Sequence, residues 1–177
     1  VISMSILKHV KASTDERDEY LRLSSALKKI EYKVEDEENV FNAQEPKISY
    51  GLFKEMRENE EFILSVTSTG YGKRSSAYEY RITARGGQGV ANMEMSERNK
   101  EVVSSFPIKD DSQIMMVTDA GKLIRMPVED IRIAGRKTQG VILFRTAEGE
   151  KVVSVTKLEA DDDDEEELTS EEGSEVL

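Results

Sequence analysis

The chain has 177 residues, enough for one ordinary domain or for a core with accessory segments. With no cysteine, it excludes disulfide frameworks and thiolate zinc sites and fits a reducing compartment, and its single histidine, His9, argues against histidine-based catalytic triads and multi-histidine metal sites. No apolar run approaches the roughly 20 residues needed to cross a bilayer, so we expect a soluble, cytoplasmic protein that does not enter a membrane.

The formal net charge of −11 is unevenly distributed along the chain. Residues 1–60 have a net charge of −3 and residues 61–159 a net charge of +2, whereas residues 160–177 contain 10 Asp and Glu and no Lys or Arg. Most of the acidity therefore belongs to the last segment, and the middle of the chain has room for basic clusters.

Residues 1–10 open with VISMSI, which resembles the apolar strands EVVSSF at 101–106 and KVVSVT at 151–156. We therefore interpret 1–10 as the last strand of an earlier structural unit. The chain starts at Val1 rather than at a methionine, which suggests a fragment, and because two units and a leftover strand cannot close a ring, we expect further units of the same kind before Val1.

Residues 11–60 read as a helical insertion. Ser13 and Glu16 have the spacing of a capping box at the start of a helix over 13–31. Apolar residues recur there at helical spacing: Tyr20, Leu23, Leu27 and Ile30. A loop rich in Glu and Asn is expected next, followed by a second short helix near 50–57.

Residues 61–159 contain an internal repeat with an offset of 51 positions. The offset aligns TSTGYGKR (67–74) with TDAGKLIR (118–125), and YRITARGGQGV (80–90) with IRIAGRKTQGV (131–141). An ungapped match of this kind indicates two copies of one unit, at 61–109 and 110–159.

Each unit reads as four β-strands. FILSVTS and QIMMVTD are apolar runs that end at a glycine turn, Gly70 or Gly121. A second strand (KRSSAY or LIRMPV), a polar corner, a third strand (GVANMEM or GVILFRT) and a closing strand (VVSSF or VVSVT) follow. Four strands per unit of about 50 residues predict an all-β, propeller-like fold built of blades.

Basic residues gather at the corners of both units, and the glycines beside them let backbone N–H groups approach a ligand closely, so these residues are candidate contacts to phosphate groups. In the first blade they are Lys73, Arg74, Arg81, Arg85 and Arg98, and in the second Lys122, Arg125, Arg132, Arg136 and Lys137. Two alternatives remain open. The glycines can be simple turn residues, and Arg81 and Arg132 can pair with Glu79 and Asp130.

Together, GYGKR, TDAGKLIR and GRKTQGV, with the acidic end of the chain, closely resemble the C-terminal DNA-wrapping domain of the A subunit of bacterial DNA gyrase. The resemblance is strong over 61–159 and includes 1–10, while 11–60 looks like an insertion of the kind associated with alphaproteobacterial gyrases. It implies a six-bladed β-pinwheel of which this chain supplies the last two blades and the acidic tail. The DNA wrapping of that family needs many phosphate contacts that ignore base sequence along a rim, so the resemblance implies that the basic residues of the two corners contact DNA phosphates. In that family a signature wrapping box has arginine where Ala84 stands and lysine where Gln88 stands, so Arg85 is expected to make only a supporting contact.

The resemblance implies that the parent is an ATP-dependent type II topoisomerase that introduces negative supercoils. Its implied partners are double-stranded DNA, the rest of the A subunit, with which it is continuous, and the B subunit, in an A2B2 heterotetramer. ATP, magnesium and the catalytic tyrosine belong to other domains, and no GxxxxGK[ST] loop occurs here, so this chain is expected to be non-catalytic, with no cofactor and no metal site of its own. The alternatives are the C-terminal domain of the topoisomerase IV A subunit, or a propeller-like protein-interaction module.

The acidic segment 160–177 is expected to be disordered, because like charges repel one another. Its aspartates and glutamates lack the spacing of a divalent-cation loop. A tethered polyanion beside a basic rim would compete with DNA phosphates, and this predicts a regulatory tail.

Overall fold

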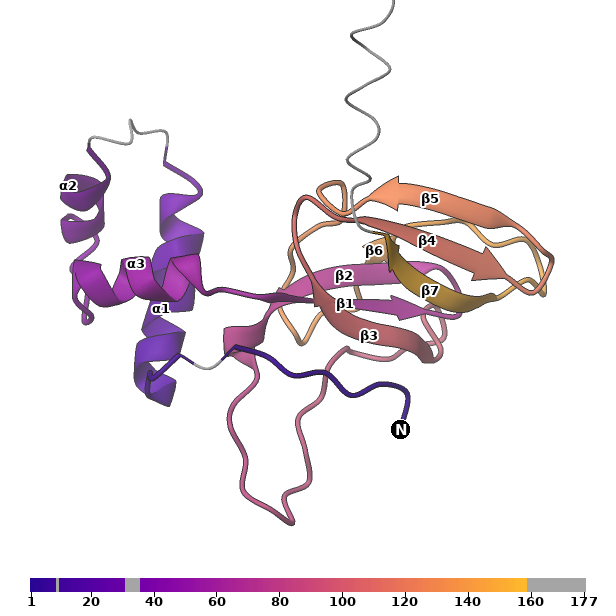
Figure 1. The fold of residues 1–177 in the computed structure, drawn as a ribbon, viewed down its shortest axis with the longest axis horizontal. Coiled ribbons are helices and arrows are strands. Elements are labelled where there is room, and N and C mark those ends of the chain that lie inside the picture. The colour runs from indigo at the N-terminus through magenta and orange to yellow at the C-terminus, as the bar shows by residue number, and fades with distance from the viewer. Residues whose placement is uncertain (9, 31–35, 159–177) are drawn as a thin grey trace, which may run out of the picture.

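The computed structural model describes residues 1–8, 10–30 and 36–158. Within these ranges, two antiparallel sheets lie beside a group of helices (Figure 1). None of the helices found there is long and apolar enough to cross a membrane. The acidic segment 160–177, predicted to be disordered, lies outside the described residues.

Helix α1 (Thr14–Leu27) begins at the predicted capping box. The Glu16 N–H donates to Ser13 Oγ over 3.3 Å, and the Ser13 N–H donates to Glu16 Oε2 over 2.7 Å. Tyr20, Leu23 and Leu27 are buried, as the helical spacing predicted. The helix ends before Ile30, which is 38% exposed, so the predicted helix was a few residues too long.

Two short helices complete the insertion. Helix α3 (Tyr50–Glu58) occupies the predicted position, with Ser49 as its N-cap. Helix α2 (Glu37–Asn42) lies where a loop was expected. Its six residues are too few to show a helical period, and it is held by tertiary contacts, since the ring of Phe41 packs 5.1 Å from Phe53 and 5.2 Å from Tyr50.

The first sheet has the order β3-β1-β2-β6. Strands β1 (Phe62–Thr67) and β2 (Tyr71–Ser76) form the predicted hairpin, a 3-10 turn η2 (Ala77–Glu79) follows, and β3 (Val102–Ile108) is the predicted closing strand. All pairings between these strands are antiparallel.

Strand β6 (Val141–Ile142) belongs to the second repeat, yet it pairs with β2 of the first, with Tyr71 opposite Ile142. The expectation that each unit supplies its own third strand is therefore wrong. Residues 89–95 form no strand, and only two residues of GVILFRT do. The physical reason is that a strand needs a partner edge, and β6 already occupies the outer edge of β2.

The second sheet has the order β5-β4-β7, with β4 (Gln113–Thr118), β5 (Leu123–Pro127) and β7 (Val152–Leu158) at their predicted positions. The two sheets share a core to which the first contributes Leu64 and Val66 and the second Ile114 and Met116. In the described part of the chain, no strand covers the outer edge of β5.

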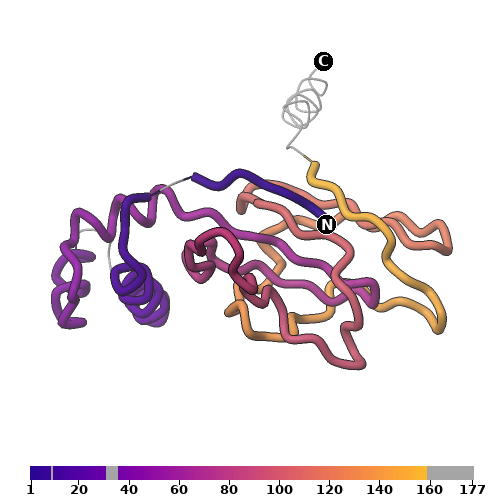
Figure 2. The backbone as a smooth tube through the Cα atoms, turned by 90° about the horizontal axis from the view of Figure 1, so that it is seen from below, coloured from indigo at the N-terminus to yellow at the C-terminus, as the bar shows by residue number. Residues whose placement is uncertain are grey.

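A separate core holds the insertion against the first blade. It contains α1, α2 and α3 side chains together with Tyr78 of η2, and Figures 1 and 2 show the helices at one end of the sheets. Residues 1–8 run beside β3 without forming a strand, and the Ser3 hydroxyl donates to Ser105 O. Their assignment to a preceding blade stays a prediction.

Candidate nucleic-acid interface

The corner of the first unit, residues 80–90, is a loop that extends away from the sheets (Figure 1). Arg81 and Arg85 are exposed, and across the described residues neither side chain forms an ion pair or hydrogen bond. The loop turns at Gly86 and Gly89, which have φ of +80° and +79°. Both guanidinium groups are therefore available to a ligand.

The equivalent corner of the second unit, 131–140, packs against β2 of the first. The Ala134 N–H donates to Arg74 O over 2.8 Å, and the Arg74 N–H donates to Arg132 O over 3.1 Å. At Gly140, with φ of +81°, an added Cβ would lie 2.8 Å from Gly72 O. Glycine is thus needed at this point because two backbones approach closely.

Lys73, predicted as a phosphate contact, is completely buried, so this prediction is corrected. Its Nζ donates to the carbonyls of Gly135, Arg136 and Thr138 over 2.8, 2.5 and 3.1 Å. Burial lowers the pKa of its ammonium to about 8. The physical reason for the burial is that one ammonium satisfies three carbonyls of the tight corner, and this joins the two units.

Arg74 is also buried, which corrects its assignment as a phosphate contact. Its Nε donates to Ile131 O over 2.7 Å, and its guanidinium forms an ion pair with Asp110. The GYGKR sequence therefore marks the junction between blades, where buried polar groups need partners.

Arg136 is half-buried and holds the base of the exposed loop. Its backbone N–H donates to Glu79 Oε2 over 2.6 Å, and its guanidinium donates to Ala91 O, so it contacts both ends of 80–90. The Glu79 carboxylate thus accepts a hydrogen bond from Arg136 rather than pairing with Arg81. Within the described ranges neither Arg81 nor Arg132 forms an ion pair, so the predicted alternative pairing is not the arrangement found.

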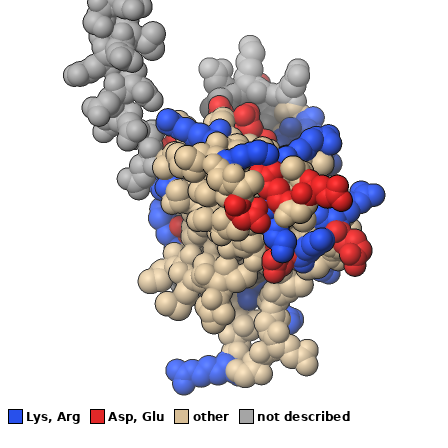
Figure 3. Space-filling model, turned by 90° about the vertical axis from the view of Figure 1, so that its right-hand side faces the viewer, with Lys and Arg blue, Asp and Glu red and all other residues tan. Residues whose placement is uncertain are grey.

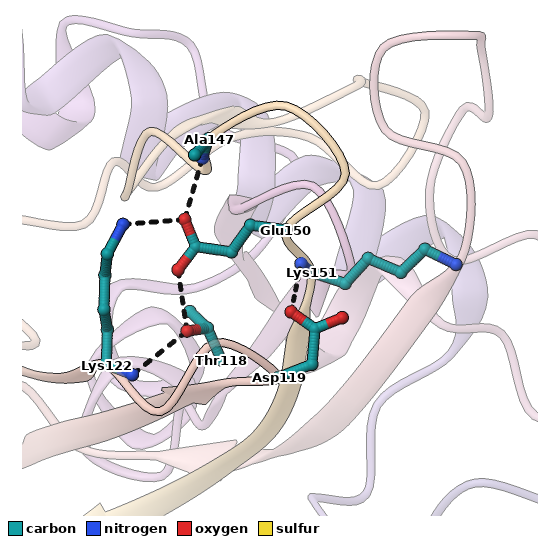
Figure 4. Close-up of polar contacts among 6 residues, drawn as sticks. All are labelled: Thr118, Asp119, Lys122, Ala147, Glu150 and Lys151. Atoms are coloured by element: carbon teal, nitrogen blue, oxygen red, sulfur yellow. Dashed lines mark hydrogen bonds and ion pairs between the residues drawn. The ribbon is translucent and has the colours of Figure 1, made fainter.

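Lys122 belongs to a polar network around Glu150 (Figure 4). Glu150 Oε2 accepts from Lys122 Nζ and from the Ala147 N–H, both over 2.8 Å, and Oε1 accepts from the Thr118 hydroxyl over 2.7 Å. The hydrogen bond from Lys122, followed by those from Ala147 and Thr118, lowers the pKa of Glu150 to about 2. Lys122 is half-exposed, and a phosphate would have to share it with Glu150.

The exposed members of the predicted set are Arg81, Arg85, Arg98, Lys122, Arg125, Arg132 and Lys137. On the face at the right-hand end of Figure 1, basic and acidic side chains are interspersed (Figure 3). That face is not a continuous basic patch.

Sequence reasoning gave no role to Lys28 and Lys29, which follow α1 and line a hollow beside Arg136 and Lys137. Their signal in the sequence was only a pair of adjacent lysines.

Comparison with known proteins gives consistent matches. A family model described as the DNA gyrase C-terminal domain, beta-propeller, matches residues 61–109 and 112–159. The DNA gyrase A subunit of Rickettsia bellii is 48% identical over 99% of this chain, which covers 20% of that protein. The DNA gyrase A subunit of Granulibacter bethesdensis is 45% identical over 88% of this chain, and the chain covers 18% of it. The chain thus spans about a fifth of the length of these curated relatives.

Two solved structures share the fold. A structure of a DNA gyrase A C-terminal domain matches with a TM-score of 0.53 at 23% identity, over 56% of this chain and 34% of that one. The crystal structure of the C-terminal domain of DNA topoisomerase IV matches with a TM-score of 0.53 at 26% identity, over 60% of this chain and 33% of that one. The match supports the propeller-like architecture seen in the two sheets.

Proposed function

Because the chain belongs to the DNA gyrase C-terminal domain family, we propose that it is a non-catalytic DNA-binding and DNA-wrapping module of the A subunit of DNA gyrase. The observation that carries the proposal is the exposed loop 80–90, which presents Arg81 and Arg85 without partners among the described residues while Arg136 holds its base. Two unpaired guanidinium groups on an anchored loop suit phosphate contacts that ignore sequence.

The buried cations have a different task in this proposal. Lys73 and Arg74 fix the second corner on the first blade, and this sets the spacing of the exposed cations on either side of the junction. DNA that follows these cations from one blade to the next would have to bend wherever they do not lie along a straight line, and bending costs energy that the added phosphate contacts must offset. The path would use Arg81, Arg85, Arg98, Arg125, Arg132 and Lys137.

The activity of the parent belongs to the proposal as well, because the chain spans about a fifth of its relatives. The parent would be an ATP-dependent type II topoisomerase of the cytoplasm that introduces negative supercoils together with the B subunit of gyrase. ATP and magnesium would be bound by other parts of that enzyme. The A subunit of topoisomerase IV is the second candidate, since one similar structure is named for that enzyme, but the curated relatives carry the name of gyrase.

The acidic segment 160–177 would lower DNA affinity by competing for the same cations. Removing it at residue 160 should raise affinity at low salt and have less effect at high salt, where charges are screened. Unchanged affinity at low salt would refute this role.

The test of the main proposal is a titration of linear duplex DNA with this chain across a range of salt concentrations. DNA binding through several phosphates predicts a steep linear fall of log K with log salt, with a slope of about 0.9 per contact. Absence of binding at low salt, for both this chain and the complete A subunit, would favour a protein-interaction module. Wrapping is then checked by binding the complete A subunit to a nicked circle, sealing the nick with DNA ligase and removing the protein, after which the linking number of the circle should be shifted with one sign only.

A further inference from the structure

A seam runs between the helical insertion and the blades. It contains two hollows, of about 720 and 630 Å³, and both are lined by Lys28, Glu60, Phe62 and Ile133. The first hollow reaches the corner with Arg136 and Lys137, and the second reaches Lys109 beyond β3. The insertion and the predicted DNA-binding corner therefore share one continuous surface.

Several lysines of this seam have no ion-pair partner among the described residues. The side chains of Lys29, Lys109 and Lys137 are exposed, and within the described ranges they form no ion pair. Lys28 is exposed as well, with its Nζ 5.8 Å from the centroid of the Phe62 ring. Four ammonium groups from three parts of the chain thus face solvent along one seam.

The carboxylates of the seam are mostly engaged by the fold. Glu60 accepts from the Tyr20 hydroxyl over 2.8 Å, and Glu61 accepts from the Lys8 N–H over 2.5 Å. Glu79 accepts from the Arg136 N–H, and Asp110 is paired with buried Arg74. Eight Lys and Arg against six Asp and Glu line the two hollows, so the seam has an excess of cations in a chain with a net charge of −11.

The position of Lys28 and Lys29 is fixed by the packing of the insertion. The Tyr78 hydroxyl of the first blade donates to Met56 O of α3 over 2.9 Å, and its ring packs 5.3 Å from Tyr20 of α1 in an edge-on arrangement. Because α1 is packed on the blade in this way, the lysines at its end stay at a fixed distance from the corner with Arg136 and Lys137. The insertion is therefore placed to extend the basic surface of that corner.

We propose that this seam is a phosphate-binding surface for duplex DNA, and that Lys28 and Lys29 of the insertion lengthen the DNA path that includes Lys137. The inference rests on the proposed DNA-binding function and adds to it a role for residues 11–60. Exposed lysines on a fixed element bind phosphates as point charges, whatever the base sequence.

The test compares two double variants of this chain on the same linear duplex. In the seam variant, Lys28→Gln with Lys29→Gln, affinity at low salt should fall several-fold, and the slope of log K against log salt should lessen by about 2, close to 0.9 per lost contact. The control variant, Lys11→Gln with Lys54→Gln, makes the same charge change on exposed lysines of the insertion that line neither hollow. Its slope should stay at the wild-type value.

Each other outcome overturns the inference. Equal changes of slope in both double variants would show a general charge effect. If the slope is steep in wild type and unchanged in the seam variant, the chain binds DNA but the seam does not contact it. If wild type and the complete parent protein both fail to bind duplex DNA, the proposed function fails first. A rise in the affinity of the seam variant that disappears when residues 160–177 are removed would assign the seam to the acidic segment of the chain itself. Circular dichroism of each variant establishes that the helices remain.

Discussion

Residues of one type have opposite roles at equivalent positions of the two units. Arg74 is buried with its guanidinium paired to Asp110, whereas Arg125, its equivalent at an offset of 51, is exposed and donates to Gln113 Oε1 over 2.5 Å. The difference arises because the second corner is hydrogen-bonded to β2, whereas no described strand pairs with the outer edge of β5. A basic residue in a repeat unit is therefore a candidate DNA contact only where the neighbouring unit leaves its side chain exposed.

At the residue scale, Glu150→Gln should weaken the dependence of the free energy of unfolding on pH in the acidic range. The folded pKa of Glu150, about 2, lies below its ordinary value of 4.5, so its charge stabilises the fold above pH 4.5 and this contribution is lost as the pH falls from 4.5 toward 2. We expect the variant to unfold at lower urea concentration than wild type at pH 7, and the difference to shrink between pH 4.5 and pH 2. The exposed neighbour Glu148, changed to Gln, is the control and should match wild type. A difference for Glu150→Gln that is constant with pH would contradict the assignment.

At the scale of elements, the turns of the hairpins β1–β2 and β4–β5 have different surroundings. Gly70 and Gly121 hold equivalent positions with φ of +76° and +80°. An added Cβ at Gly70 would collide with Phe144 O of the second unit, whereas at Gly121 it would meet no atom within 4 Å. The turn of the first hairpin is thus built into the junction between units, whereas the turn of the second is hydrogen-bonded within its own unit and leaves room for a Cβ at Gly121.

Replacing each of these glycines with alanine should separate backbone strain from crowding. Gly121→Ala should cost about 1–2 kcal/mol for a left-handed residue with a Cβ. Gly70→Ala should cost clearly more, because the segment that donates from Leu143 and Phe144 to Gly70 O must also move. Urea unfolding at equilibrium measures both. Equal losses for the two variants would mean that the contact at Phe144 does not stabilise the junction.

At the scale of the whole molecule, Tyr78 links the two cores. It belongs to the first blade, yet it packs in the core of the insertion with Tyr20, Phe53 and Met56. Burial raises the pKa of its hydroxyl to about 12, and the guanidinium of Arg17 lies 5.8 Å from its ring centroid. Through this side chain, the helices and blades are expected to unfold together.

The substitution Tyr78→Ala should make the helical insertion and the blades unfold separately. The loss of a buried aromatic side chain costs about 3–5 kcal/mol, and here it falls on the contact between the two cores. Hydrogen exchange followed by mass spectrometry should then show residues 14–27 and 50–58 losing protection at lower urea than 62–76 and 113–127, whereas wild type loses protection in one step. Tyr78→Phe keeps the ring, removes only the hydrogen bond to Met56 O, and should still unfold in one step. A single transition in Tyr78→Ala would show that other contacts join the two parts.

The sequence alone determined the elements and their repetition. Helical spacing and a capping box located α1, and apolar runs with glycine turns located the seven strands in the described part of the chain, although the predicted strand over 89–95 did not form. These features depend on neighbours within a few residues, so they are visible in the chain. The helix α2 was not visible, because its stability comes from aromatic contacts with α3 rather than from its own six residues.

The tertiary structure decided which units pair and which cations are exposed. The strand β6 completes the sheet of the first unit, and Lys73 and Arg74 are buried where the second corner covers them. No local pattern distinguishes Arg74 from Arg125 or Lys73 from Lys137, since burial depends on a segment about 60 residues further along the chain. The sequence thus determined that a basic corner repeats, and the packing of one unit on the next determined which of its cations bind the protein and which remain for DNA.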